Sequence, residues 1–233
     1  MPPTSRSPLV PASLRRVALF ILPFAVLACN SDIALSPKTP ASVKIVSGDK
    51  QTTVAGTPPA LPLIVRVTNS GGTPLGGVTV NWGIGVGGGT LGSATSLTDV
   101  NGIAQVIYTP GTKVDTAAKV IATVQLLTAT FTLKLIAGPP TSVAPFSGDG
   151  AAAVVNSTLK LFAKVVDSNG NGIPGIVVTW TAFNGGTVSD LTGTSDAGGV
   201  VRTTLTVGAT PGPYIVTAIA AGLTPATFTI TGV

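Results

Sequence analysis

Histidine and glutamate are absent from the 233-residue sequence, and its eight acidic side chains are all aspartates. A serine or threonine nucleophile therefore has no imidazole beside it to take its proton, and no glutamate is present to act as a general acid or base. Charged residues make up 9% of the chain, while 29 glycines and 19 prolines favour short strands joined by tight turns. The composition predicts an all-β protein that is not an enzyme and needs no cofactor.

Cysteine is nearly absent too, because Cys29 is the only one in the chain. A single thiol cannot form a disulfide within the chain, so the folded parts must be held together by packing alone.

Positive charge is in modest excess, with a formal net charge of +5. Three of the thirteen basic residues, Arg6, Arg15 and Arg16, precede a segment that we expect to be removed. Thirteen minus three leaves ten lysines and arginines against eight aspartates, a net charge of +2. In the sequence these ten are scattered singly, and no basic run is present to follow a phosphate backbone. We therefore expect no nucleic acid partner.

The N-terminus has the organisation of an export signal. Arg15 and Arg16 precede an uncharged apolar run over residues 17–28, which is too short for a membrane-spanning helix of about 20 apolar residues. The length of the run and its charged flank are typical of a secretory signal peptide. We predict that residues 1–28 are this signal peptide.

The signal ends in Val26-Leu27-Ala28-Cys29, which resembles the bacterial lipobox. The resemblance implies that Cys29 is acylated and becomes the N-terminus of the mature protein, which would then be bound to the membrane through its lipid. An ordinary signal peptide with an accidental cysteine is the alternative. Residues 29–39 form the lipidated N-terminus and a polar tether, and Asn30 after the cysteine favours the outer membrane or the cell surface.

The rest of the chain consists of two copies of one sequence repeat. Residues 61–82 align without gaps on residues 159–180, and shorter matches flank both segments. The two copies meet at Gly138-Pro139-Pro140, where the prolines limit bending. We predict one domain over residues 40–138 and a second over residues 139–233.

Each copy alternates apolar and polar residues with a period of two. Leu63, Val65 and Val67 share a face, and Leu161, Ala163 and Val165 share the equivalent face in the second copy. Such alternation is typical of strands with one buried side. Each copy has about seven such runs over roughly a hundred residues, which predicts two tandem immunoglobulin-like antiparallel β-sandwiches of about seven strands each.

Motifs at equivalent places in both copies resemble the bacterial Ig-like domains of the invasin and intimin family. They include a turn, at residues 167–175 of the second copy, that leads into Gly-x-x-Val-x-Trp, and a Thr/Ser-Asp-x-x-Gly turn at residues 98–102 and 195–199. The resemblance covers nearly all of residues 40–233. It implies the sandwich fold and a role as a stalk, spacer or adhesive module, but it supplies no binding residues.

Asp167, Asn169 and Asn171 form the one candidate cation site. With the glycine that follows them they match the first half of a calcium loop, D-x-[DN]-x-[DN]-G. Val178 occupies the twelfth position, where such a loop has a bidentate glutamate. Hairpin turns favour the same residues for their backbone angles, so we expect a turn without a metal ion.

Two further pairs of residues have a structural and a functional interpretation. Asp99 and Asp196 each precede a glycine at the start of a strand, where the carboxylate can accept local backbone N–H groups. Trp82 and Trp180 are in phase with buried valines, which favours a place in the core over a sugar-stacking platform.

The sequence as a whole predicts a non-catalytic lipoprotein of the cell envelope that acts by adhesion or as a structural or interaction module. Its partners would be the membrane, through the lipid, and a protein or cell-surface partner. One alternative is a solute- or glycan-binding module, which would need exposed aromatic residues or a polar pocket, whereas the few aromatic residues are expected in the core. Another is an accessory subunit of an envelope complex.

Overall fold

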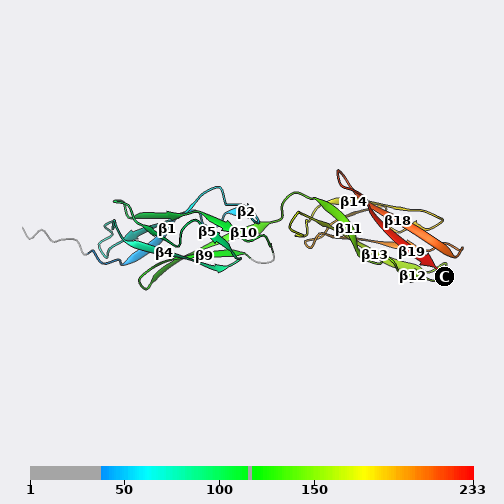
Figure 1. Cartoon of the computed structure of the whole chain (residues 1–233), viewed down its shortest axis with the longest axis horizontal. Coiled ribbons are helices and arrows are strands. Elements are labelled where there is room, and N and C mark those ends of the chain that lie inside the picture. Colours follow the sequence, from blue (N-terminus) through cyan, green and yellow to red (C-terminus); the bar gives the residue numbers. More distant parts are fainter. Residues whose placement is uncertain (1–37, 115–116) are drawn as a thin grey trace, which may run out of the picture. The chain divides into compact units, whose positions relative to one another are not determined.

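The computed structural model describes residues 38–114 and 117–233 (Figure 1). All regular structure in these residues is β-strand, which confirms the all-β prediction. No helix within these two ranges is long and apolar enough to cross a membrane. The signal segment 1–28, the lipid attachment at Cys29 and most of the tether 29–39 lie outside the described residues, so they stay predictions.

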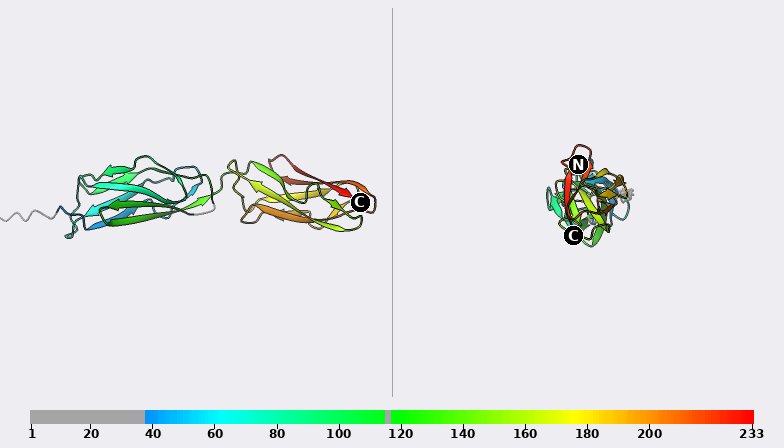
Figure 2. Two further views of the ribbon diagram at one scale, coloured as in Figure 1. Left: turned by 60° about the horizontal axis from the view of Figure 1, so that its bottom comes forward. Right: turned by 90° about the vertical axis from the view of Figure 1, so that its right-hand side faces the viewer.

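The first repeat is a sandwich of two sheets with a short ribbon beside them (Figure 2). One sheet has the order β1-β3-β7, the other β2-β10-β9-β4-β6, and the ribbon pairs β5 with β8. The strands are β1 (Ser42–Ser47), β2 (Thr52–Val54), β3 (Leu63–Thr68), β4 (Thr79–Val86), β5 (Gly89–Leu91), β6 (Thr95–Leu97), β7 (Ile103–Val106), β8 (Tyr108–Pro110), β9 (Ala118–Val124) and β10 (Leu127–Ile136).

The second repeat has the same two layers, with sheet orders β11-β13-β17-β15 and β12-β19-β18-β14-β16. Strands in equivalent positions of the two repeats follow one another in the same order, as a duplication requires. The strands are β11 (Ser142–Ser147), β12 (Ala152–Ala153), β13 (Thr158–Val166), β14 (Val177–Ala182), β15 (Thr187–Val188), β16 (Thr192–Thr194), β17 (Val200–Thr206), β18 (Gly212–Ala220) and β19 (Ala226–Gly232).

Both repeats contain more strands than the seven that the sequence indicates. The additional ones are edge strands of two or three residues, such as β2, β12 and β15, which are too short to show an alternating pattern. In addition, Ile107 interrupts the strand formed by β7 and β8, whereas its counterpart β17 is continuous.

The first strand of each repeat changes sheets at a glycine. β1 pairs with β3, and β2 then pairs in parallel with β10 in the opposite sheet. Between them Gly48 has a φ of 93°, and a Cβ there would collide with the carbonyl oxygen of Pro62. Gly148 repeats this with a φ of 97°, and β12 pairs in parallel with β19. The antiparallel prediction therefore holds except for one short parallel pair per repeat.

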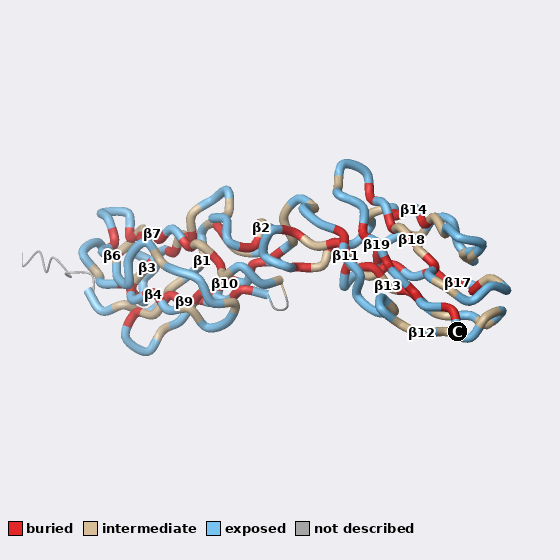
Figure 3. Tube along the Cα trace, turned by 45° about the vertical axis from the view of Figure 1, so that its right-hand side comes forward, coloured by how far each residue is buried: buried red, intermediate tan, exposed pale blue. Residues whose placement is uncertain are grey.

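The buried apolar residues form two clusters, one inside each sandwich. Figure 3 colours the buried positions of both repeats red along the backbone. The side chains predicted to share a buried face on β3 and β13 are all fully buried, at 0% exposure. Each cluster also includes one tryptophan and one phenylalanine, at 6.1 Å between ring centroids in the first repeat and 5.6 Å in the second. The interior of each sandwich is thus complete without side chains of the other.

Backbone contacts nevertheless group residues 36–233 into one unit. The boundary at Gly138 therefore stays a prediction, and it rests on the separation of the two apolar clusters.

Candidate functional site

The residues predicted as the candidate calcium loop lie between β13 and β14, and Asp167 organises this turn. Its Oδ1 accepts the backbone N–H groups of Asn169 and Asn171 at 2.8 and 2.9 Å. Its Oδ2 accepts the side-chain amide of Asn171 and the backbone N–H of Gly138, both at 2.9 Å. Each carboxylate oxygen thus faces two N–H donors, as in an Asx turn, whereas the oxygens of a calcium site must face the ion.

Asp167 carries its charge in a buried position, since it is only 3% exposed. Burial raises the pKa of this carboxyl, but hydrogen bonds from the Asn171 side chain and from the backbone of Gly138, Asn171 and Asn169 outweigh it. The net result is a pKa below the usual value of 3.8. The ionised carboxylate therefore stabilises the fold at neutral pH.

Asn169 and Asn171 contact a loop of the first repeat. The Asn171 Nδ2 donates to the carbonyl oxygen of Thr112 at 2.8 Å, and its Oδ1 accepts the backbone N–H of Val114 at 3.3 Å. The Lys113 Nζ donates to the carbonyl oxygen of Asn169 at 2.6 Å. The predicted residues thus come together as a turn that joins the two repeats, a role that the sequence did not indicate.

No group of three or more potential metal-ligating side chains gathers anywhere in the described parts of the chain. That calcium does not bind at Asp167 stays a prediction.

The remaining turn aspartates also accept backbone N–H groups. Asp99 Oδ1 accepts two, each at 2.8 Å, and Asp196 Oδ1 accepts two, each at 2.9 Å, so the turn interpretation is confirmed for both. Sequence reasoning missed Asp49 and Asp149, whose Oδ1 atoms accept the backbone N–H groups of β10 and β19 at 2.8 Å. The sequence repeats Ser-Gly-Asp at residues 47–49 and 147–149, but this motif does not indicate which strand the aspartate will contact.

Both tryptophans lie in the core, at 5% and 1% exposure, which confirms the structural interpretation. They differ in one contact. The Trp82 Nε1 donates to Ser96 Oγ at 2.9 Å, whereas the Trp180 Nε1 is buried without an acceptor among the described residues. Ser96 is paired with Val80 in the register of β4 and β6, and Gly193 takes the same place opposite Val178.

Two serines precede a lysine by three residues, a spacing that some acyl-transfer enzymes use for a serine nucleophile and its base. In one pair, Ser157 and Lys160, the serine Oγ donates to the carbonyl oxygen of Val154 at 2.6 Å, and Lys160 is exposed in β13. In the other, Ser47 ends β1 and Lys50 lies in the following turn. The Ser157 hydroxyl therefore donates to a carbonyl oxygen and not to the Lys160 amine, which a lysine base would require.

The expectation that the aromatic residues are buried is wrong for two phenylalanines. Phe146 is 59% exposed and Phe183 is 46% exposed. Phe146 is exposed because it lies in β11 on the outer side of its sheet, one residue beyond Pro145, where the register shifts by a bulge. The sequence around it has no clear period of two, so its direction could not be predicted.

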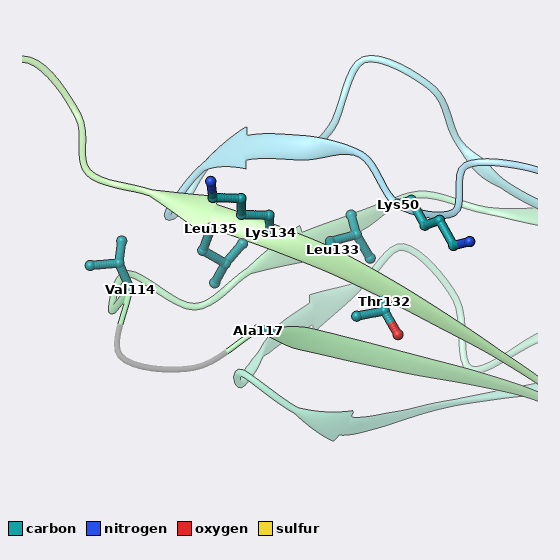
Figure 4. Close-up of a pocket in the computed structure, with 7 residues that line it drawn as sticks. All are labelled: Lys50, Val114, Ala117, Thr132, Leu133, Lys134 and Leu135. Atoms are coloured by element: carbon teal, nitrogen blue, oxygen red, sulfur yellow. The ribbon is translucent and has the colours of Figure 1, made fainter.

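One pocket of about 440 Å³ lies in the first repeat beside β10 (Figure 4). Leu133 and Leu135, both buried, form its floor, while Lys134 extends from the opposite side of the strand. It is lined mainly by apolar atoms of the core, and it gathers no set of polar groups that converge on a ligand.

The second repeat matches a protein family. Residues 143–233 match the family model described as Bacterial Ig-like domain (group 1), which confirms the predicted resemblance for this repeat. No curated protein matches the chain.

Solved structures with a similar fold include adhesins and an enzyme. The D0-D1 domain of intimin is 18% identical with a TM-score of 0.32, over 82% of this chain and 95% of that one. FdeC, an Escherichia coli adhesin, is 18% identical with a TM-score of 0.46, over 83% and 66%. A β-glycosidase from Bacteroides vulgatus is 12% identical with a TM-score of 0.39, over 82% of this chain and 24% of the enzyme. At these identities and scores, none of the likenesses bears on the function.

Proposed function

We propose that this chain is a non-catalytic lipoprotein of the cell envelope, whose two Ig-like repeats act by contact, in adhesion or as a structural or interaction module. The observation that carries the proposal is the match of the second repeat to the bacterial Ig-like domain, together with the duplication of its sandwich in the first repeat. Such domains serve as modules that hold or present surfaces, so the function depends on what they contact.

The absence of catalysis is supported by how the chain uses its polar side chains. Histidine and glutamate are missing, and five of the six aspartates in the described residues accept backbone N–H groups in turns or at strands. A carboxylate held in this way orders the local backbone and is not available to transfer a proton to a substrate.

The envelope location is supported by the lipobox-like residues 26–29 behind a short apolar segment. Acylation at Cys29 would hold both repeats near a membrane surface, where outer membrane or cell surface is the favoured location. The partner is then a protein or another component of a cell surface.

The alternative of a glycan-binding module gains one specific observation, a polar groove in the second repeat next to Phe162.

The proposal is tested by crosslinking in intact cells that express the full chain with a C-terminal affinity tag. We expect discrete crosslinked products that contain envelope components, and we expect the Cys29→Ser variant to lose them because it is no longer held at the membrane. Products that are unchanged in Cys29→Ser, or that contain only cytoplasmic proteins, would contradict the proposal.

A further inference from the structure

All positively charged side chains of the second repeat lie on one face of one sheet. Residues 139–233 contain three lysines and arginines, namely Lys160, Lys164 and Arg202. The two lysines alternate along β13 with fully buried residues, and Arg202 lies on the adjacent strand β17 between two buried residues. All three therefore extend from the outer face of the sheet β11-β13-β17-β15.

Two phenylalanines lie among these cations. Phe162 is directly opposite Arg202 in the register of β13 and β17, and it is half-buried. Phe146 on the neighbouring strand β11 is 59% exposed, and the Lys164 Nζ lies over its ring at 5.5 Å from the centroid. Cations and aromatic rings are thus interleaved on a single surface, which we call the basic face.

A groove follows the edge of the basic face. It has a volume of about 470 Å³ and is lined by Phe162 and Arg202, by threonines of β16, and by Asp190 and Asp196. A second groove of about 150 Å³ shares Phe162, Asp190 and Arg202 with the first and extends to Lys160. The two grooves therefore place cationic, anionic, hydroxyl and aromatic groups side by side.

The first repeat lacks this surface at the equivalent positions. There Pro62 and Ile64 stand in place of Lys160 and Phe162, and Gln105 stands in place of Arg202. That face has only Arg66, whose Nε donates to the carbonyl oxygen of Asn101 at 3.2 Å, at a position equivalent to one of the three cations, and Lys44 lies opposite Arg66 on β1, where the second repeat has Ala144. Since the two repeats share a fold, the basic face is not a requirement of the fold.

We propose that the basic face of the second repeat binds an acidic polysaccharide. Carboxylates of uronic acid residues would pair with the lysines and with Arg202, and the C–H faces of sugar rings would pack on the phenylalanines. Sugar hydroxyls would donate to Asp190 and Asp196, which line the groove. Duplex DNA fits less well, because its deoxyribose sugars carry no free hydroxyl along the chain to donate to these two carboxylates.

This inference rests on the proposed contact role, for which it names the chemistry of the partner. The purified full chain in a nonionic detergent is titrated with polygalacturonate, a polymer of uronic acids, and the affinity is measured by calorimetry. We expect saturable binding that weakens as salt is raised from about 0.05 to 0.5 M, since salt screens exposed charges. Neutral dextran should not bind.

Two substitutions at exposed positions locate the site, and a third substitution serves as a matched control. Arg202→Gln and Phe146→Ser should each lower the affinity for polygalacturonate roughly three- to tenfold. Lys134→Gln changes the net charge by the same amount as Arg202→Gln but lies in β10 of the first repeat, so it should leave the affinity unchanged. The unfolding transition of each variant is measured to confirm that it is folded.

The outcomes separate this inference from the proposed function. Equal losses in Arg202→Gln and Lys134→Gln would show that only net charge matters and would overturn the inference. So would equal affinity for dextran, or tighter binding of duplex DNA or of polyaspartate. In each of these cases the crosslinking in intact cells can still succeed, so a failure here leaves the proposed function standing.

Discussion

The buried indole N–H of Trp180 is a defect that can be repaired by copying two residues from the first repeat. There, Ser96 accepts the Trp82 N–H at 2.9 Å, and Ala104 on β7 stands at the position that Val201 occupies on β17. In the second repeat Gly193 removes the acceptor, and a Cβ at this position would meet the Cγ2 of Val201 at 2.7 Å. Ser96 and Ala104 of the first repeat are thus replaced by Gly193 and Val201 in the second, which loses the hydroxyl acceptor and fills its space with a larger side chain.

We expect each single substitution to destabilise the second repeat. Val201→Ala removes two methyl groups from a core position that is 3% exposed, at a cost of about 1.5 kcal/mol before any cavity is counted. Gly193→Ser inserts a side chain against a β-branched neighbour, which costs about 1–3 kcal/mol of overpacking and offsets the gain from the new hydrogen bond. The double variant relieves the clash and supplies the acceptor.

The double variant Gly193→Ser/Val201→Ala should therefore lose less free energy of unfolding than the losses of the two single variants added together. Its matched control is Gly193→Ala/Val201→Ala, which has the same backbone change and the same space but no hydroxyl. The serine variant should exceed the alanine control by about 1–3 kcal/mol, the cost of leaving a buried donor unpaired. Urea unfolding of the full chain, followed by circular dichroism, measures both. Equal stability of the two double variants would refute the reasoning.

Three other predictions concern the turn and the boundary between the repeats. Because the folded pKa of Asp167 is lowered, its stabilisation is present above the usual value of 3.8 and is lost as the pH falls through the folded pKa. Asp167→Asn should thus remove stability at pH 7 and flatten the acid limb of a stability-against-pH curve; an unchanged curve would contradict this. Saturating calcium should leave the melting temperature unchanged, because both carboxylate oxygens of Asp167 already accept N–H groups. A calcium site at a hundredfold excess over Kd would instead add about 2.7 kcal/mol, and the resulting rise of several degrees would contradict the turn interpretation. Residues 139–233 alone should unfold cooperatively, and persistent disorder in that fragment would mean that the boundary at Gly138 is wrong.

The layers of each sandwich could be predicted because alternation is a strong signal on long strands. β3 and β13 carry it without interruption, and their inward residues are fully buried. The duplication strengthened the prediction, because the same alternation recurs at equivalent positions of the second copy. The sheet change at Gly48 and the short edge strands could not be predicted, because two or three residues show no period and their pairing is set by the strands around them.

The candidate sites were predictable only where the relevant contacts are local. The turns at Asp99 and Asp196 accept N–H groups two and four residues ahead, so the sequence contains both partners. The contacts of Asn171 with Thr112 and Val114 join residues more than fifty positions apart. The basic face is hidden for the same reason, because β13 and β17 become neighbours only in the folded sheet.

The most direct test of the central proposal, a lipid-anchored module, is detergent phase partitioning of the full chain and its Cys29→Ser variant, with mass spectrometry of the N-terminal peptide. We expect the unchanged chain to enter the detergent phase with Cys29 as its acylated first residue. The Cys29→Ser variant should remain unacylated and move to the aqueous phase. Full detergent partitioning of Cys29→Ser, or an unmodified Cys29 in the unchanged chain, would contradict the account.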